Sequence, residues 1–287
     1  SPLWHRVSVM TDVEGVGIGL RMEMAEELLE KQPPEVKWLE VHPENYMDRG
    51  GRYPSVLKRA MEKWPIATHG LTMCYGRAEP FDPLYLETLR TFLSDLDSPW
   101  HSDHLCFSDV DGVFAHDLLP LPFNEEAAKL FTRRIEEARD ATGCENLAFE
   151  NVSYYAESPD SETDEVDFCL DVLGRADCKM LLDVNNVYVN SRNLGFDPKK
   201  WLDQIPGDRV VQIHVAGHLV RHDGFRIDTH GEDICDDVFE LLDHTLQRIG
   251  PKPVLLERDG NFIPLDELLE QVRRLEEIYE RATMGSR

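Results

Sequence analysis

The sequence lacks long apolar runs and is poor in basic residues, and each absence excludes a class of protein. No apolar stretch approaches the roughly 20 residues that a membrane-spanning helix needs. We also find no apolar segment followed by a small-residue cleavage site near the first residue, so we predict neither a secretory signal nor a membrane partner. Lys and Arg number 30 against 55 Asp and Glu, which gives a formal net charge of −25. Such a chain repels a phosphate backbone, and without a local basic patch we predict no nucleic-acid partner.

The sequence also lacks paired cysteines and a phosphate-binding loop. Its six cysteines form no CxxC pair and have no regular spacing. Scattered cysteines in a chain of 287 residues indicate reduced, mostly buried thiols, and we predict a cytoplasmic protein. The Gly-rich stretches at 48–52 and 69–76 do not match a phosphate-binding fingerprint.

Short apolar runs alternate with longer segments of helical periodicity along the whole chain. The apolar runs, predicted as strands, are 16–21, 36–42, 65–70, 99–107, 146–151, 179–184, 209–215 and 253–258. The periodic segments, predicted as helices, are 22–31, 54–64, 83–96, 124–141, 164–174, 198–205, 234–250 and 265–282. Asn124 is typical of a helix N-cap and Gly250 of a helix C-terminus.

Eight strands alternating with eight helices predict a parallel sheet that closes into a (β/α)8 TIM barrel. We predict one domain over residues 1–287 with a core at about 16–280. An open, doubly wound sheet is the alternative. It is less favoured because it would spread the polar residues at the strand ends too widely to share a site.

Six side chains of the kinds that bind metals lie at or near the ends of predicted strands three to eight. They are His69, His104, Glu150, Asp183, His214 and Glu257. In a barrel the C-terminal strand ends meet on one face. Burying charged groups without partners is costly, and these strand ends supply no cation except Arg258. We therefore predict a metal site. Imidazole and carboxylate ligands without thiolate suit zinc, iron or manganese. Taken singly, each residue has an alternative role as a hydrogen-bonded histidine or a helix-capping carboxylate.

Two further pairs stand close to these residues in the sequence. Asp183 and Asn186 follow the sixth predicted strand, and Asp228 and His230 follow the seventh. This D-x-x-N then D-x-H layout resembles the xylose-isomerase-like TIM barrels, especially the trinuclear-zinc apurinic endonucleases. Those enzymes have His where this chain has Asn186, a departure that weakens the prediction of a third metal site.

Nine sequence blocks, in order, resemble one family more closely. They are WLEVHPENYMDRGG (38–51), THGLTMCYG (68–76), SDHLCFS (102–108), LLPLPFNEEA (118–127), FENVSYY (149–155), LLDVNNVYVNS (181–191), IHVAGH (213–218), DTHGEDI (228–234) and LLERDGNFIPL (255–265). This pattern is similar to the DUF692 (UPF0276) family of multinuclear non-heme iron-dependent oxidative enzymes. The resemblance implies a TIM barrel with two or three iron ions in mixed Fe2+ and Fe3+ states, and O2 as co-substrate. It also implies oxidation of a side chain, most often Cys and alternatively Asp, in a ribosomally made precursor peptide.

The resemblance further implies roles for individual residues. The implied metal ligands are His69, His104 and Glu150 at a first iron, with Glu150 bridging to a second iron held by Asp183, His214 and Glu257, and Asn186, Asp228 and His230 at a third. We predict that catalysis involves Glu150, Asp183, His214 and Asp228. Residues expected to orient the ligands through hydrogen bonds are Asn151, Asn185, His218 and Glu44.

We thus predict an iron oxidase that modifies a precursor peptide, aided by a small leader-binding partner protein as in other family members. The first alternative is a zinc-dependent hydrolase or phosphodiesterase of the endonuclease type, which the acidic charge disfavours. The second is a metal-binding accessory protein without catalytic activity. A sugar isomerase is a weaker alternative, because these strand ends lack the lysine that such barrels use.

Overall fold

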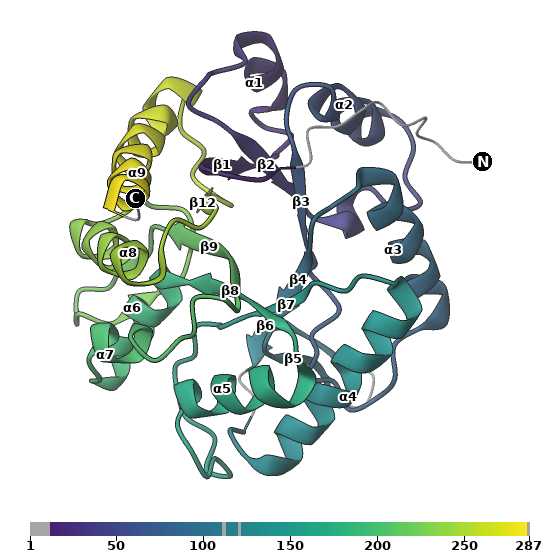
Figure 1. Cartoon of the computed structure of the whole chain (residues 1–287), viewed down its shortest axis with the longest axis vertical. Coiled ribbons are helices and arrows are strands. Elements are labelled where there is room, and N and C mark those ends of the chain that lie inside the picture. Colours follow the sequence, from purple (N-terminus) through teal and green to yellow (C-terminus); the bar gives the residue numbers. More distant parts are fainter. Residues whose placement is uncertain (1–11, 111–112, 120–121, 286–287) are drawn as a thin grey trace.

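The computed structural model describes residues 12–110, 113–119 and 122–285 and contains a closed barrel of eight parallel strands (Figure 1). Around the barrel the strands follow the order β1, β12, β9, β8, β7, β4, β3, β2. Their bounds are β1 Val16–Gly19, β2 Trp38–Val41, β3 Ile66–His69, β4 His101–His104, β7 Leu147–Glu150, β8 Lys179–Asp183, β9 Val210–Ala216 and β12 Val254–Glu257. Each lies within or overlaps one of the eight predicted apolar runs, so the predicted barrel is confirmed.

Helices form an outer ring around these strands (Figure 1). Their bounds are α1 Ala25–Lys31, α2 Arg52–Met61, α3 Pro83–Leu96, α4 Glu125–Thr142, α5 Glu165–Ala176, α6 Val184–Leu194, α7 Pro198–Leu202, α8 Asp236–Ile249 and α9 Leu265–Gly285. Two predicted helix ends are confirmed. The Asn124 side chain caps α4 by accepting a hydrogen bond from the amide of Ala127, and Gly250 follows the last residue of α8.

The strands are buried on both faces, as a barrel filled by side chains and covered by helices requires. All four residues of β2, β3, β7 and β12 are buried. Close packing also explains Gly17 in β1, where a Cβ atom would clash with the Trp38 ring. The indole nitrogen of Trp38 donates to the carbonyl of Gly15 at 3.2 Å, which satisfies this buried ring.

Helix α6 was not predicted from the sequence. It begins directly after β8, where Asp183 accepts a hydrogen bond from the amide of Asn186 at 2.7 Å. Its sequence VNNVYVNSRNL is rich in β-branched residues and Asn, which have low helix propensity. The helix is nevertheless buried over its first eight residues, so packing and the Asp183 cap outweigh local preference.

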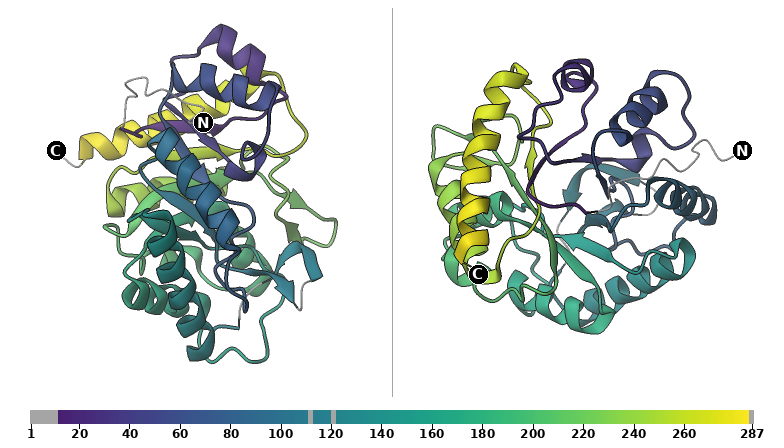
Figure 2. Two further views of the ribbon diagram at one scale, coloured as in Figure 1. Left: turned by 90° about the vertical axis from the view of Figure 1, so that its right-hand side faces the viewer. Right: turned by 45° about the horizontal axis from the view of Figure 1, so that its top comes forward.

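Short elements interrupt the regular alternation at the carboxyl ends of the strands. The predicted strand 99–107 is a strand only over β4, and β5 Phe107–Val110 then pairs with β6 Val113–Leu119 as a hairpin. A second hairpin joins β10 Leu219–Val220 to β11 Arg226–Ile227, and a 3-10 turn spans Pro43–Asn45. The left view of Figure 2 shows both hairpins, one blue and one green, projecting from the same side of the molecule. Within the described ranges, none of the helices is long and apolar enough to cross a membrane.

Candidate metal centre

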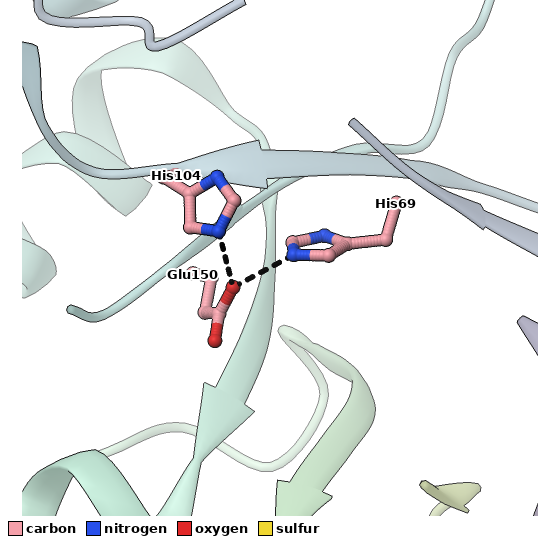
Figure 3. Close-up of side chains that lie close together, drawn as sticks. All are labelled: His69, His104 and Glu150. Carbon is pink, nitrogen blue, oxygen red and sulfur yellow. Dashed lines mark ion pairs between the residues drawn. The ribbon is translucent and has the colours of Figure 1, made fainter. Parts of the chain in front are cut away.

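The first cluster joins the ends of three neighbouring strands, β3, β4 and β7. His69 and His104 both direct their Nε2 atoms at one carboxylate oxygen of Glu150, at 2.9 and 3.3 Å (Figure 3). Parallel register explains this meeting, because His104 lies opposite Glu150 across β4 and β7. The other nitrogen of each ring forms a hydrogen bond. His69 Nδ1 bonds to the hydroxyl of Ser102 at 2.8 Å, and His104 Nδ1 bonds to Asp103 at 3.2 Å. One ion can therefore be held by two imidazoles and a carboxylate.

The second cluster shares Glu150 with the first and adds side chains from β8, β9 and β12. The Nδ1 atom of His214 lies 3.2 Å from Glu257, 3.6 Å from Glu150 and 4.0 Å from Asp183. All four residues are buried, and their ligand atoms lie close enough together to hold one ion. Because Glu150 belongs to both clusters, it can bridge two cations and reduce their mutual repulsion.

A buried carboxylate that the sequence analysis missed fixes the orientation of His214. Glu40 accepts from His214 Nε2 at 2.8 Å and from the amide of Gln212 at 2.6 Å. Since an ionised carboxylate only accepts, His214 Nε2 carries a proton, and Nδ1 is the nitrogen that faces the cluster and can bind a metal ion once it is deprotonated. The available signal was Glu40 itself, a charged residue in the middle of the apolar run WLEV.

A third group shares Glu257 with the second cluster and consists of His230, Glu257 and Asp259. His230 Nδ1 lies 3.2 Å from Glu257 and 3.3 Å from Asp259, while its Nε2 lies 2.7 Å from Asp228. Asp259 was not among the predicted ligands, although it follows Glu257 by two residues. His230 adopts a left-handed backbone with φ of 48°, a costly conformation that turns its ring toward these carboxylates.

The guanidinium that contacts these groups is that of Arg21, which lies two residues after β1. Arg21 donates to one oxygen of Asp259 from two nitrogens, at 2.9 and 2.7 Å. Arg258, the one cation noted at the ends of predicted strands three to eight, has other partners, because it pairs with Asp233 at 2.8 Å and binds two backbone carbonyls. The described chain thus sets one guanidinium beside several carboxylates.

Asn186 and Asp228, two predicted ligands, lie beside the clusters with other contacts. The amide of Asn186 donates to the carbonyl of Asn151 at 3.0 Å, and its side-chain oxygen is buried. Asp228 accepts from the amide of Asn185 at 2.9 Å and from the hydroxyl of Ser153 at 3.1 Å. Asp228 therefore contacts the third group through its ion pair with His230.

The residues predicted to orient the ligands take different positions. Asn151 forms a two-way pair with the backbone of Asp183, with both distances 2.9 Å. Asn185 accepts from His218 Nδ1 at 2.8 Å and donates to Asp228, so these two residues support the third group. Glu44 lies elsewhere. It accepts hydrogen bonds from Leu71, Thr72 and Tyr85, which hold the loop after β3.

Burial and neighbouring charges both shift the pKa values of the side chains in the centre. Burial raises the pKa of Asp183 well above its usual range, and the adjacent Glu150 and Asp228 carboxylates raise it further. Burial opposes protonation of His214, but Glu40 and Glu257 outweigh it and raise the pKa of this ring well above 6.5. The pKa of Glu40 falls to about 2 against the effect of burial, because His214 stabilises its charge. Charges in this centre are therefore strongly interdependent.

Several donor atoms of the predicted ligands are buried without a hydrogen-bond partner within the ranges that the structure describes, as expected for atoms that bind a metal ion. Although several lie close together, they lack a partner in hydrogen-bonding geometry among the described residues. The buried atoms concerned are Glu150 Oε2, Asp183 Oδ2, Asn186 Oδ1, His214 Nδ1, His230 Nε2 and Glu257 Oε2. Buried polar atoms normally have partners, and six of the predicted ligands each contribute one buried atom that lacks such a partner among the described residues. Imidazole, carboxylate and amide donors are all able to bind metal ions, so this centre could hold them.

Comparison with known proteins now identifies the family. The sequence model of one protein family, the RiPP precursor modification enzymes MbnB/TglH/ChrH, matches residues 15–280. RiPP stands for a ribosomally synthesised and post-translationally modified peptide. The chain belongs to this family. A UPF0276 protein of Anaeromyxobacter sp. strain Fw109-5 is 41% identical over 264 residues, which cover 92% of each chain. A UPF0276 protein of Pseudomonas aeruginosa strain PAO1 is 40% identical over 270 residues, which cover 94% of each. The resemblance inferred from the nine sequence blocks is thereby confirmed.

Solved structures confirm that this RiPP precursor modification enzyme family member has a xylose-isomerase-like barrel. Endonuclease IV from Thermus thermophilus aligns with a TM-score of 0.60 over 93% of this chain and 99% of its own. A D-allulose 3-epimerase from Methylomonas sp. aligns with a TM-score of 0.59 over 97% and 100%. Both are only 14% identical to this chain, so the likeness concerns the fold alone.

Proposed function

We propose that this protein is a multinuclear iron enzyme that uses O2 to oxidise a side chain, Cys or alternatively Asp, in a ribosomally made precursor peptide. Membership in the RiPP precursor modification family supports the peptide substrate. The observation that carries the metal assignment is the set of six buried donor atoms without hydrogen-bond partners. We further propose that a small leader-binding protein presents the peptide and that the enzyme acts in the cytoplasm, where thiols stay reduced.

The proposed iron ligands follow the clusters. His69, His104 and Glu150 would hold one ion, and Glu150, Asp183, His214 and Glu257 a second. A third, more weakly held ion would lie at His230, with Glu257 and Asp259 or with Asn186 and Asp228. Bound iron would supply redox chemistry and a site for O2 and the substrate thiolate or carboxylate.

The protein's own residues would orient and isolate this chemistry. Glu40 and Ser102 fix the ring nitrogens that His214 and His69 present, while Asp103 does the same for His104. Such supporting contacts preserve ligand geometry during turnover. The barrel wall around the ligands is buried, which excludes water from all but the open carboxyl end of the strands. Among the residues we propose for catalysis, Glu150, Asp183 and His214 share one cluster, and Asp228 acts beside His230.

The decisive experiment measures the metal content of protein purified without oxygen. Elemental analysis, combined with Mössbauer spectroscopy of a 57Fe-enriched sample, should find two or more irons per chain in mixed oxidation states. Stoichiometric zinc without iron, persisting after growth in iron-rich medium, would overturn the proposal in favour of a hydrolase.

The Glu150→Ala variant tests the bridging role. It should lose metal from both clusters and all O2-dependent turnover, because it removes the one ligand that they share. Glu165→Ala is the matched control, since Glu165 is an equally buried carboxyl outside the clusters. Full turnover by Glu150→Ala would contradict the model.

A further inference from the structure

The β10–β11 hairpin connects the second cluster to the third group. The chain leaves β9 two residues before His218, forms the hairpin, and leaves β11 at Asp228, which contacts His230. The base of the hairpin is packed tightly, because a Cβ atom on Gly217 would overlap the carbonyl oxygen of Glu232. Both ends of the hairpin are therefore anchored beside residues that contact His230 directly or through Asn185 and Asp228.

The outer edge of β11 is closed by side chains. Asn193 accepts from the amide of Arg226 at 2.9 Å and donates to its carbonyl at 2.8 Å, in the manner of a neighbouring strand. The hydroxyl of Tyr155 accepts from the amide of Asp228 at 3.2 Å. These contacts leave no place for a further strand on this side.

The outer edge of β10 is open. Val220 lies opposite Arg226, and the amide of Arg221 donates to the carbonyl of Phe225 at 2.8 Å. In antiparallel pairing this register turns the amide and carbonyl of Val220 away from β11. Neither group has a hydrogen-bond partner in the described part of the chain, where this sheet consists of β10 and β11 alone.

The open edge is apolar and adjoins a groove. Leu219 is 42% and Val220 52% exposed, although apolar open edges are usually protected against unwanted pairing. A groove of about 400 Å³ runs beside them, and its lining residues are His218, Leu219, Val220, Glu232, Asp233, Arg258 and Ile263. Asp233 is neutralised by Arg258, whereas Glu232 has no cation within ion-pair distance among the described residues.

Other exposed apolar side chains mark the same end of the barrel. Five of the seven large ones in the described chain follow strand ends: Leu71, Tyr155, Leu219, Val220 and Phe262. The other two, Leu84 and Met284, lie on the outer helices. Apolar exposure concentrated around one opening is typical of a binding surface.

We propose that β10 is the docking edge for the precursor peptide, which adds to the hairpin as a third strand. This inference rests on the proposed function for its choice of occupant. Main-chain hydrogen bonds to Val220 would supply affinity, and alternate side chains would enter the groove, as in other cases of strand addition. The unbalanced carboxylate of Glu232 selects a segment that carries Lys or Arg beside its apolar residues. The bound segment would run past His218 toward the metal centre.

The test uses peptides selected from a random displayed library of about twelve residues against the purified holoenzyme under exclusion of O2. Fluorescence anisotropy then measures their binding to wild type, Val220→Pro and Val220→Thr. Proline removes the free amide of the edge, whereas threonine keeps both the amide and the β-branched shape. We expect binding at least about tenfold weaker for Val220→Pro and within about twofold of wild type for Val220→Thr.

Equal binding by the proline variant, or equal losses in both variants, would overturn the docking edge. N-methylation of alternate peptide residues gives an independent test should the Val220→Pro protein be misfolded. One methylation register must abolish binding and the other must not, and indifference to both overturns the proposal. So does a wild-type dimer that Val220→Pro dissociates, because the edge then binds a second copy. Since binding is measured without O2, a failed iron analysis refutes the oxidative function and leaves this result standing.

Discussion

Glu40 offers the sharpest test of how the protein controls its metal centre, because it touches a ligand without lying in a cluster. We expect Glu40→Gln to weaken metal binding at the second cluster by about 10- to 100-fold, or about 1.4 to 2.7 kcal/mol. Glutamine keeps the size of the side chain but removes the charge that fixes the His214 tautomer at 2.8 Å. It can also present an amide to His214 Nε2 and so favour the wrong tautomer.

The assay is equilibrium dialysis against ferrous iron without oxygen, followed by elemental analysis. The matched control is Glu44→Gln, since Glu44 is a half-buried carboxyl in the 3-10 turn after β2 and contacts Leu71, Thr72 and Tyr85 instead of a ligand. Its affinity for iron should stay close to that of wild type. If Glu40→Gln is folded and binds iron within about twofold of wild type, the carboxylate does not hold His214 in its binding form.

Two further predictions concern other parts of the site and the stability of the fold. Asn186→Ala should leave two irons and partial activity, measured by elemental analysis and O2 uptake. Asn190→Ala, on the same buried helix, should leave the iron content unchanged, and loss of all iron from Asn186→Ala would contradict this division. Burial raises the pKa of Glu165 from 4.5 to about 8, so the folded state retains a proton that the unfolded chain loses. Stability should therefore fall between pH 4.5 and 8, by up to a few kcal/mol at about 1.4 kcal/mol per unit. Glu165→Gln should reduce this dependence of the free energy of unfolding on pH, measured by denaturant titrations at several pH values. An unchanged pH dependence would refute the assignment to Glu165.

The barrel could be predicted because its signal is repeated and local. Most barrel strands are short apolar runs that are buried on both faces, and each of the six ligands predicted first stands at or near the end of a barrel strand. Parallel closure then brings distant residues together without any knowledge of their contacts. His69, His104 and Glu150 illustrate this, since strand register alone places them on adjacent strand ends.

The parts that could not be predicted depend on tertiary contacts. Helix α6 has a sequence unfavourable to helices and is stabilised by burial and by the Asp183 cap. Glu40 was hidden inside an apolar strand, where its role depends on His214, 174 residues away. Asp259 and Arg21 form an ion pair although they are 238 residues apart in the sequence, and no local pattern identifies such a pair.

The balance of charge favours the proposed binding of cations from outside the chain at this centre. Glu40, Glu150, Asp183 and Glu257 are all buried, and Asp228 and Asp259 lie at their border. Protonated histidines can offset part of this charge, but a histidine that binds metal must be neutral at its ligating nitrogen. Arg21 is committed to Asp259 and lies at one edge of the centre. Metal ions shared through Glu150 and Glu257 would neutralise the interior carboxylates without consuming the imidazole lone pairs.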